Sequence, residues 1–172
     1  MPLWLSFLLR ERGAVLQAFH NCMSNDLLHF EDFTPGRKFF GGPCRITKDD
    51  IIAFAREFDP QPHHLDEEAG KRSMLGSLSA SGWHVSAIAM RLFAESVILR
   101  TANNGGPGVE DGRWMKPVRP DDVLMLETEV AAARPSASRP EIGLVKFVWR
   151  LFNQKGQVAE FVVTTMPTRR GA

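Results

Sequence analysis

The sequence contains no tyrosine, only two cysteines and no excess of charge of either sign. The missing tyrosine excludes every mechanism that uses a tyrosine acid, base or nucleophile. Cys22 and Cys44 do not form a Cys-x-x-Cys pair, which excludes a cysteine-rich zinc site and a disulfide framework. Two cysteines are typical of a reducing compartment, so we expect a cytoplasmic protein.

Charges of the two signs almost cancel. Lys and Arg number 21 and Asp and Glu number 20, giving a net charge of +1. This balance argues against a nucleic-acid partner bound by phosphate neutralisation and against a polybasic membrane-surface protein. The apolar run at the N-terminus is too short to span a bilayer, and its charges follow it, whereas a secretory signal has them before. We therefore expect neither a nucleic-acid nor a membrane partner.

The length of 172 residues predicts one domain with its own core. We expect this domain over residues 23–172, because an unbroken globular pattern follows Met23. Residues 1–22 are then an N-terminal extension, either a short packing helix or the product of a misassigned start.

Helical patterns come first along the chain and strand patterns last, which predicts an α+β fold. Thr47 is a good N-cap for a helix that ends near Asp59, and Gly41–Pro43 is expected to break the chain before it. A stiff loop then leads to a short helix over Glu67–Lys71. Two longer kinds of element follow, namely an apolar helix and strands rich in β-branched residues. The helix is expected from about Ser81 to about Arg100, and the strands over Val109–Val118, Val123–Ala133, Ile142–Phe152 and Gln157–Thr165.

The densest cluster of ionisable groups is Asp59, His63, His64 and Asp66, in a loop stiffened by prolines. A carboxylate and an imidazole that share one water can activate it and return its proton elsewhere, which makes the cluster a candidate general acid–base site. Spacing alone equally allows a helix-terminal aspartate with solvated histidines. A metal site is a third reading, but the ligand spacing is not distinctive, and we expect none.

A small-residue turn opens the long helix. Free backbone N–H groups at a helix N-terminus stabilise an anion, and Gly82 lets a substrate carbonyl approach the backbone closely. Capping by Ser79 or Ser81 is the purely structural interpretation, and it is compatible with the functional one. His84, two residues further on, is expected to line the core or a pocket wall.

Three segments resemble the MaoC-like dehydratases, also called (R)-specific enoyl-CoA hydratases. Phe54–Asp66 contains Asp-Pro-Gln-Pro-His-His, which is similar to the family's Asp-x-Asn-Pro-x-His. Ser79–Trp83 reads Ser-Ala-Ser-Gly-Trp, and Gly112–Asp122 contains Pro-Val-Arg-Pro-Asp-Asp, close to the family's Pro-Val-Arg-Pro-Gly-Asp. The departures are Gln61 in place of Asn, Phe58 in place of Gly and Asp121 in place of Gly.

The resemblance implies a hot-dog fold, in which an antiparallel sheet wraps a long helix, and a homodimer or higher homo-oligomer with the site at the interface. It implies reversible syn hydration of a trans-2-enoyl thioester of coenzyme A or acyl carrier protein, in fatty-acid metabolism, without a metal or redox cofactor. Asp59 and His64 would activate the water. Gly82 and Ser81 would serve the oxyanion, and Gln61 would shape the loop and narrow the pocket.

Two other functions remain open on the sequence. A hot-dog thioesterase shares the fold and the acyl-CoA substrate but hydrolyses the thioester. A non-catalytic acyl-CoA binder needs neither Asp59 nor His64. The pair itself favours the hydratase.

Overall fold

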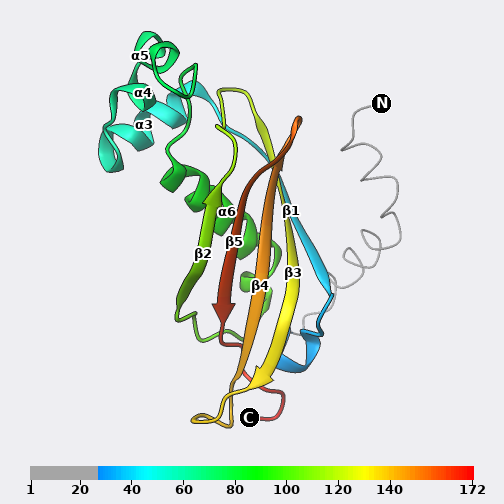
Figure 1. The fold of residues 1–172 in the computed structure, drawn as a ribbon. Helices are drawn as coiled ribbons and strands as arrows, with labels where there is room; N and C mark the ends of the chain where they lie inside the picture. Colours follow the sequence, from blue (N-terminus) through cyan, green and yellow to red (C-terminus); the bar gives the residue numbers. More distant parts are fainter. Residues whose placement is uncertain (1–26) are drawn as a thin grey trace.

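The computed structural model describes residues 27–172, so the extension expected over residues 1–22 lies outside the described residues. One antiparallel sheet has the strand order β1-β3-β4-β5-β2, and α6 crosses one of its faces (Figure 1). This arrangement confirms the α+β class and the hot-dog architecture. The strands are β1 (Lys38–Arg45), β2 (Gly108–Trp114), β3 (Val123–Pro135), β4 (Gly143–Asn153) and β5 (Gly156–Thr165).

The helical segments fall into two groups. α3 (Lys48–Phe58), α4 (Pro62–Leu65) and α5 (Glu67–Arg72) gather beyond the N-terminal end of α6 (Gly82–Ser96) (Figure 1). The single turns η1 (Phe30–Asp32) and η2 (Ile98–Arg100) precede β1 and follow α6. No helix within residues 27–172 is long and apolar enough to cross a membrane.

The core lies between α6 and the inner face of the sheet. Phe93 on α6 packs against Phe147 and Trp149 of β4, with ring centroids 5.2 and 4.6 Å apart. In α6 the apolar positions recur at helical spacing, and in β4 they alternate with half-buried residues, as expected when one face of each element is covered. These aromatic contacts fix α6 across the sheet and so fix where its N-terminus lies.

The strand β1 runs through the segment where we expected a break. A register shift lies between Gly41 and Cys44, and the Gly42–Pro43 bond is cis, yet the pairing with β3 resumes at Cys44. An edge strand tolerates a proline because one side of its backbone has no ladder partner. A Cβ on Gly41 would lie 2.7 Å from the carbonyl oxygen of Leu92, so glycine lets α6 approach the strand closely.

Three other boundaries differ from the sequence-based expectations. α6 ends at Ser96 and not near Arg100, because the C-cap Val97 leaves helical backbone at φ −130° and ψ −59° and the chain continues as a 3-10 turn. β2 ends at Trp114, because the next two N–H groups share Val158 O and Pro117 has no N–H to donate. The loop expected after Asp59 contains the helical turn α4, which starts on Pro62, since proline is well suited to the first helical position.

The expected N-cap of α3 and the short helix after the loop are confirmed. Thr47 forms a capping box with Asp50, and Asp66 caps α5 by accepting from Ala69 N at 2.8 Å. Asn153–Gly156 forms the β4–β5 turn.

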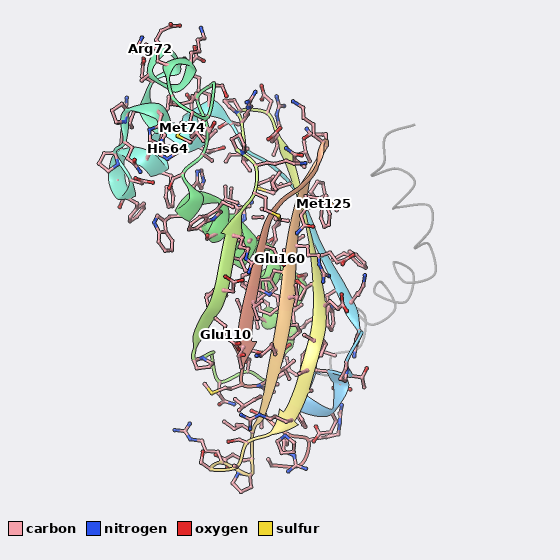
Figure 2. The ribbon with its side chains drawn as sticks, viewed as in Figure 1. His64, Arg72, Met74, Glu110, Met125 and Glu160 are labelled. Carbon is pink, nitrogen blue, oxygen red and sulfur yellow. The ribbon has the colours of Figure 1, made fainter. Side chains whose placement is uncertain are left out.

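The two exposed parts of the sheet differ in chemistry. On the outer face Arg150 forms ion pairs with Glu127, Glu129 and Glu160, and Glu160 faces away from α6 (Figure 2). At the edge, all seven residues of β2 are exposed, including the apolar side chain of Val109. An exposed edge strand offers unpaired backbone groups to another chain.

Candidate active site

Asp59 is placed by the end of α3. It is the C-cap residue, and its N–H donates to Ala55 O at 3.0 Å. Pro60 disfavours helical backbone at the preceding residue, which explains why the helix ends here. The chain then turns through α4, and this turn brings His64 back toward the carboxylate of Asp59.

Two side chains hold the carboxylate of Asp59. The hydroxyl of Ser81 donates to Oδ2 at 2.5 Å, and Nε2 of Gln61 donates to Oδ1 at 2.8 Å. The Ser81 bond, and then the Gln61 bond, hold the pKa of Asp59 below its ordinary value, so the carboxylate is ionised at neutral pH. Gln61 therefore binds the carboxylate.

The tautomer of neutral His64 follows from its hydrogen bond. The ring, which belongs to α4 (Figure 2), is buried, and its Nδ1 lies 2.7 Å from Ser79 O. A carbonyl oxygen can only accept a hydrogen bond, so Nδ1 carries the proton. In the neutral ring Nε2 is therefore an acceptor.

The two acceptors face one another across a gap. Nε2 of His64 lies 3.6 Å from Oδ2 of Asp59, which is too long for a direct hydrogen bond. Each atom can instead accept a hydrogen bond from a single water molecule that lies to one side of the line joining them. The expected convergence of Asp59 and His64 is thus present in the structure.

The other members of the ionisable cluster do not join this pair. The carboxylate of Asp66 is engaged at the start of α5, and the ring of His63 packs on His64 with centroids 4.2 Å apart. Burial lowers the pKa of His63. No group of three or more His, Cys, Asp or Glu side chains within residues 27–172 could hold a metal ion.

The start of α6 completes the geometry. Ser81 is the N-cap and accepts from Trp83 N at 3.2 Å, while Gly82 is the first helical residue. The first N–H groups of a helix have no intrahelical acceptor, so that of Gly82 is available to a ligand.

Gly82 is required here for a reason that the sequence did not indicate. A Cβ would lie 2.8 Å from two ring atoms of Trp114, so the face of Gly82 Cα is covered by an indole. The indole therefore covers the side of Gly82 on which a side chain would lie. The approach of a substrate carbonyl to the N–H of Gly82 stays a prediction.

Two functional positions were missed by sequence reasoning. Trp114 lies within the segment Gly112–Asp122, which resembles the family, but its side chain has no titratable group that would indicate a functional role. Ser79 contributes its backbone carbonyl, for which no sequence signal exists.

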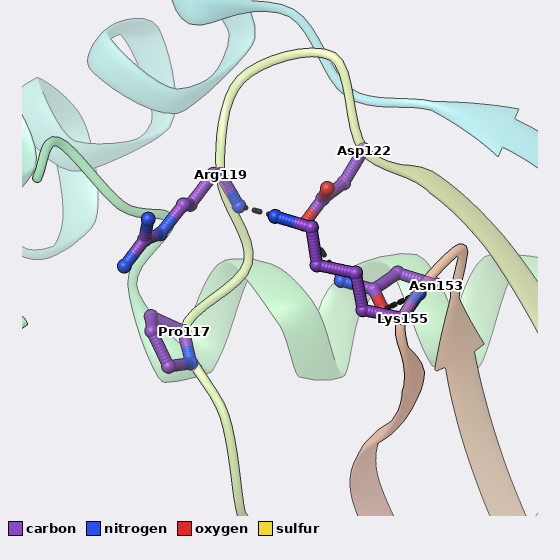
Figure 3. A pocket seen from close by; sticks show the side chains of 5 residues that line it. All are labelled: Pro117, Arg119, Asp122, Asn153 and Lys155. Atoms are coloured by element: carbon purple, nitrogen blue, oxygen red, sulfur yellow. Dashed lines mark hydrogen bonds between the residues drawn. The ribbon is translucent and has the colours of Figure 1, made fainter.

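Two cavities lie beside this region, and neither is lined by Asp59 or His64. The first, of about 200 Å³, lies between the β2–β3 loop and the β4–β5 turn (Figure 3). Its carboxylate, on Asp122, accepts from Arg119 N and from Asn153 Nδ2, each at 3.0 Å, so it is already paired.

The neighbouring Asp121 has φ 69°, which explains why glycine is common there, and it forms an ion pair with Arg45 at 2.6 Å. The second cavity, of about 340 Å³, lies between α3, β1 and α6.

Comparison with known proteins agrees with the three segments and the fold. Residues 32–143 match the MaoC-like domain. The chain belongs to the MaoC-like domain family. Within this family it is 34% identical over 128 residues to the uncharacterized protein YdeM of Bacillus subtilis, covering 74% of this chain and 89% of YdeM.

Solved structures of MaoC-like proteins have the same architecture. A MaoC-like dehydratase from Rhodospirillum rubrum is 40% identical, with a TM-score of 0.76 over 84% of this chain and 99% of that one. An R-hydratase from Pseudomonas aeruginosa is 23% identical, with a TM-score of 0.67 over 84% of this chain and 88% of that one. At the lower identity the likeness concerns the fold.

Proposed function

We propose that this MaoC-like protein is an enoyl-CoA hydratase that reversibly converts a trans-2-enoyl-CoA to an (R)-3-hydroxyacyl-CoA. The observation that carries the proposal is the pair of acceptors, Asp59 Oδ2 and His64 Nε2, which face one another at 3.6 Å. Membership of a family that contains MaoC-like dehydratases supports it, as does the fold shared with an R-hydratase. Coenzyme A enters as part of the substrate, and acyl carrier protein is the alternative carrier.

The reaction begins with a water molecule that is hydrogen-bonded to both Asp59 and His64. Asp59 is ionised and accepts a hydrogen bond from this water, which orients the oxygen toward C3 of the enoyl group. Nε2 of His64 accepts the other hydrogen as the new C–O bond forms. The carboxylate then stabilises the imidazolium at a distance of 3.6 Å. His64 returns its proton to C2 on the same face, so one water is added with syn geometry.

Negative charge develops on the thioester oxygen during the addition. The free N–H of Gly82, at the positive end of α6, is the donor that we assign to this oxygen. Because Ser81 links α6 to Asp59 through its hydroxyl, the oxyanion donor and the water are held by one rigid connection. A fixed distance between them favours the transition state over the free substrate.

A second copy of the chain is part of the proposal. Asp59 and His64 line neither of the two cavities described above, and large apolar side chains are exposed close to them. Trp83 is 64% exposed and packs on Trp114 at the end of the edge strand β2, and Phe58, which directly precedes Asp59, is 62% exposed. A homodimer formed along this edge would cover these groups and enclose the acyl chain.

The test is an assay with crotonyl-CoA that follows enoyl absorbance and free thiol together. Hydration removes the absorbance without releasing thiol. Thiol release with unchanged enoyl absorbance identifies a thioesterase and contradicts the proposal, while tight binding without either change identifies a non-catalytic binder.

A further inference from the structure

The cavity between α3, β1 and α6 has a polar group in an otherwise apolar inner wall. Its buried lining consists of Cys44, Ile46, Ile88 and His84, and Phe54 stacks on the imidazole with ring centroids 4.5 Å apart. The volume of about 340 Å³ lies at the small end of the range of about 300–1,000 Å³ that is usual for ligand pockets. It fits a short acyl group better than a long alkyl chain.

His84 has unused hydrogen-bonding capacity. It is 9% exposed, its Nδ1 is buried without a partner, and neither ring nitrogen is hydrogen-bonded to any group within residues 27–172. A buried polar side chain without a partner is costly, so an unpartnered imidazole in the wall of a cavity indicates a ligand that supplies one. Nδ1 itself has almost no accessible surface, so Nε2 is the nitrogen that such a ligand can reach. Burial lowers the pKa of His84, so the ring is neutral and offers one donor and one acceptor.

The charges at the cavity rim are balanced and largely engaged. Arg45 pairs with Asp121, and Asp50 accepts from Thr47. Arg91 donates to Cys44 Sγ at 2.8 Å and faces Glu95, while Glu57 adds a second acid to the lining. Two acidic and two basic residues leave no net charge to select an ionised ligand. The polar group that best matches Nε2 of a neutral imidazole is a hydroxyl, because it can either donate to this nitrogen or accept from it.

The cavity shares its walls with the candidate active site. Phe58 lines the cavity and directly precedes Asp59, and His84 is one turn after Ser81 on α6. His84 follows Gly82 by two residues, about 3 Å along the helix axis and about 200° around it. The distal end of an acyl group whose thioester is held at Gly82 would therefore enter the cavity by passing around the start of α6.

We propose that this cavity selects short acyl groups that carry a hydroxyl at the distal end, and that His84 is the specificity-determining residue that binds this hydroxyl. The proposal rests on the proposed function for the position of the thioester. It adds that the protein selects its substrate by the polarity of the distal end of the acyl group. An apolar residue at position 84 would instead accept a plain alkyl chain.

The test measures binding of saturated thioesters by calorimetry, so that it does not depend on hydration. Pentanoyl-CoA, 5-hydroxypentanoyl-CoA and glutaryl-CoA have the same chain length and differ only at the end. We expect the hydroxylated ligand to bind about tenfold more tightly than pentanoyl-CoA. Equal or tighter binding of pentanoyl-CoA overturns the proposal, and so does tightest binding of glutaryl-CoA, which would assign the end group to Arg91.

Variants separate His84 from the rest of the cavity. His84→Leu should abolish the preference for the hydroxyl, and His84→Gln should retain part of it. Met90→Leu is the matched control, because Met90 lies on the same helix, is 47% exposed and does not line the cavity. A preference that persists in His84→Leu contradicts the assignment. If His84→Leu does not fold, the ligand series with the unaltered protein still decides. Loss of hydration with an intact binding preference would contradict the proposed function alone.

Discussion

The hydroxyl of Ser81 donates to Asp59 Oδ2 at 2.5 Å, so the residue that caps α6 also fixes the residue that ends α3. The two elements are separated by the whole of α4 and α5 in the sequence. This hydrogen bond makes the position of the water and the position of the helix N-terminus mutually dependent.

Replacing Ser81 with alanine should lower kcat by about 10- to 100-fold, because a hydrogen bond to a charged group is lost. Loss of the N-cap should also lower the free energy of unfolding by about 1 kcal/mol. Thr47→Ala is the control, since it removes the cap of α3 with a similar loss of stability and should leave kcat unchanged. Ser81→Thr, which keeps a hydroxyl, should restore most of the rate; equal rates for the Ala and Thr variants would contradict this positioning role.

Gln61→Ala should move the acidic limb of the pH–rate profile to higher pH. The pKa of Asp59 is lowered by the bond from Ser81 and next by that from Gln61, so removing the second bond raises this pKa toward its ordinary value. Activity requires the ionised carboxylate and should be lost earlier as the pH falls. The decrease in kcat at neutral pH should be smaller than about tenfold. The measurement is kcat/KM between acidic and neutral pH, and an unmoved limb would show that Gln61 does not act on Asp59.

Gly82→Ala should destabilise the protein by about 1–3 kcal/mol, because the new Cβ would lie 2.8 Å from the Trp114 ring. Denaturant titration measures the stability, and crotonyl-CoA hydration measures the accompanying loss of activity. Trp114→Ala removes the obstacle together with its own packing, so Gly82→Ala should cost nothing further when it is added to Trp114→Ala. Full stability of the single variant would mean that the indole does not lie against Gly82.

Val109→Lys should shift the protein from dimer to monomer in light-scattering chromatography. Val109 is 63% exposed on the edge strand β2, and a lysine there disfavours pairing with a second chain. Leu99→Lys is the control, because Leu99 is 76% exposed but lies in η2 and not on the edge strand. A wild-type protein that is monomeric at all concentrations, or a Val109→Lys variant that remains dimeric, would place the interface elsewhere.

The sequence indicated those parts of the molecule that depend on local chemistry. Thr47, Pro60 and the strand periodicities act within a few residues of where they stand, so the cap of α3, its end and the four later strands could be predicted. The pairing of Asp59 with His64 came from resemblance, since spacing alone left the cluster undecided.

The rest depends on contacts between distant segments. The carbonyl of Ser79 orients His64 from fifteen residues away, and Trp114 covers Gly82 from another strand. Neither contact has a periodicity or motif. Pro62 also has no unambiguous local signal. Proline ends a helix when it stands in the interior, but it favours a helix when it stands at the first position, as it does in α4.

The most direct test of the account is a double-mutant cycle on the acid–base pair, measured as kcat for hydration of crotonyl-CoA. Asp59→Asn and His64→Gln should each lower kcat by about 10²–10⁴-fold with the melting temperature nearly unchanged. The double variant should lose little more than either single one, because both residues act on one water. Unchanged turnover in either single variant, or losses that multiply in the double variant, would contradict the shared water as the centre of the mechanism.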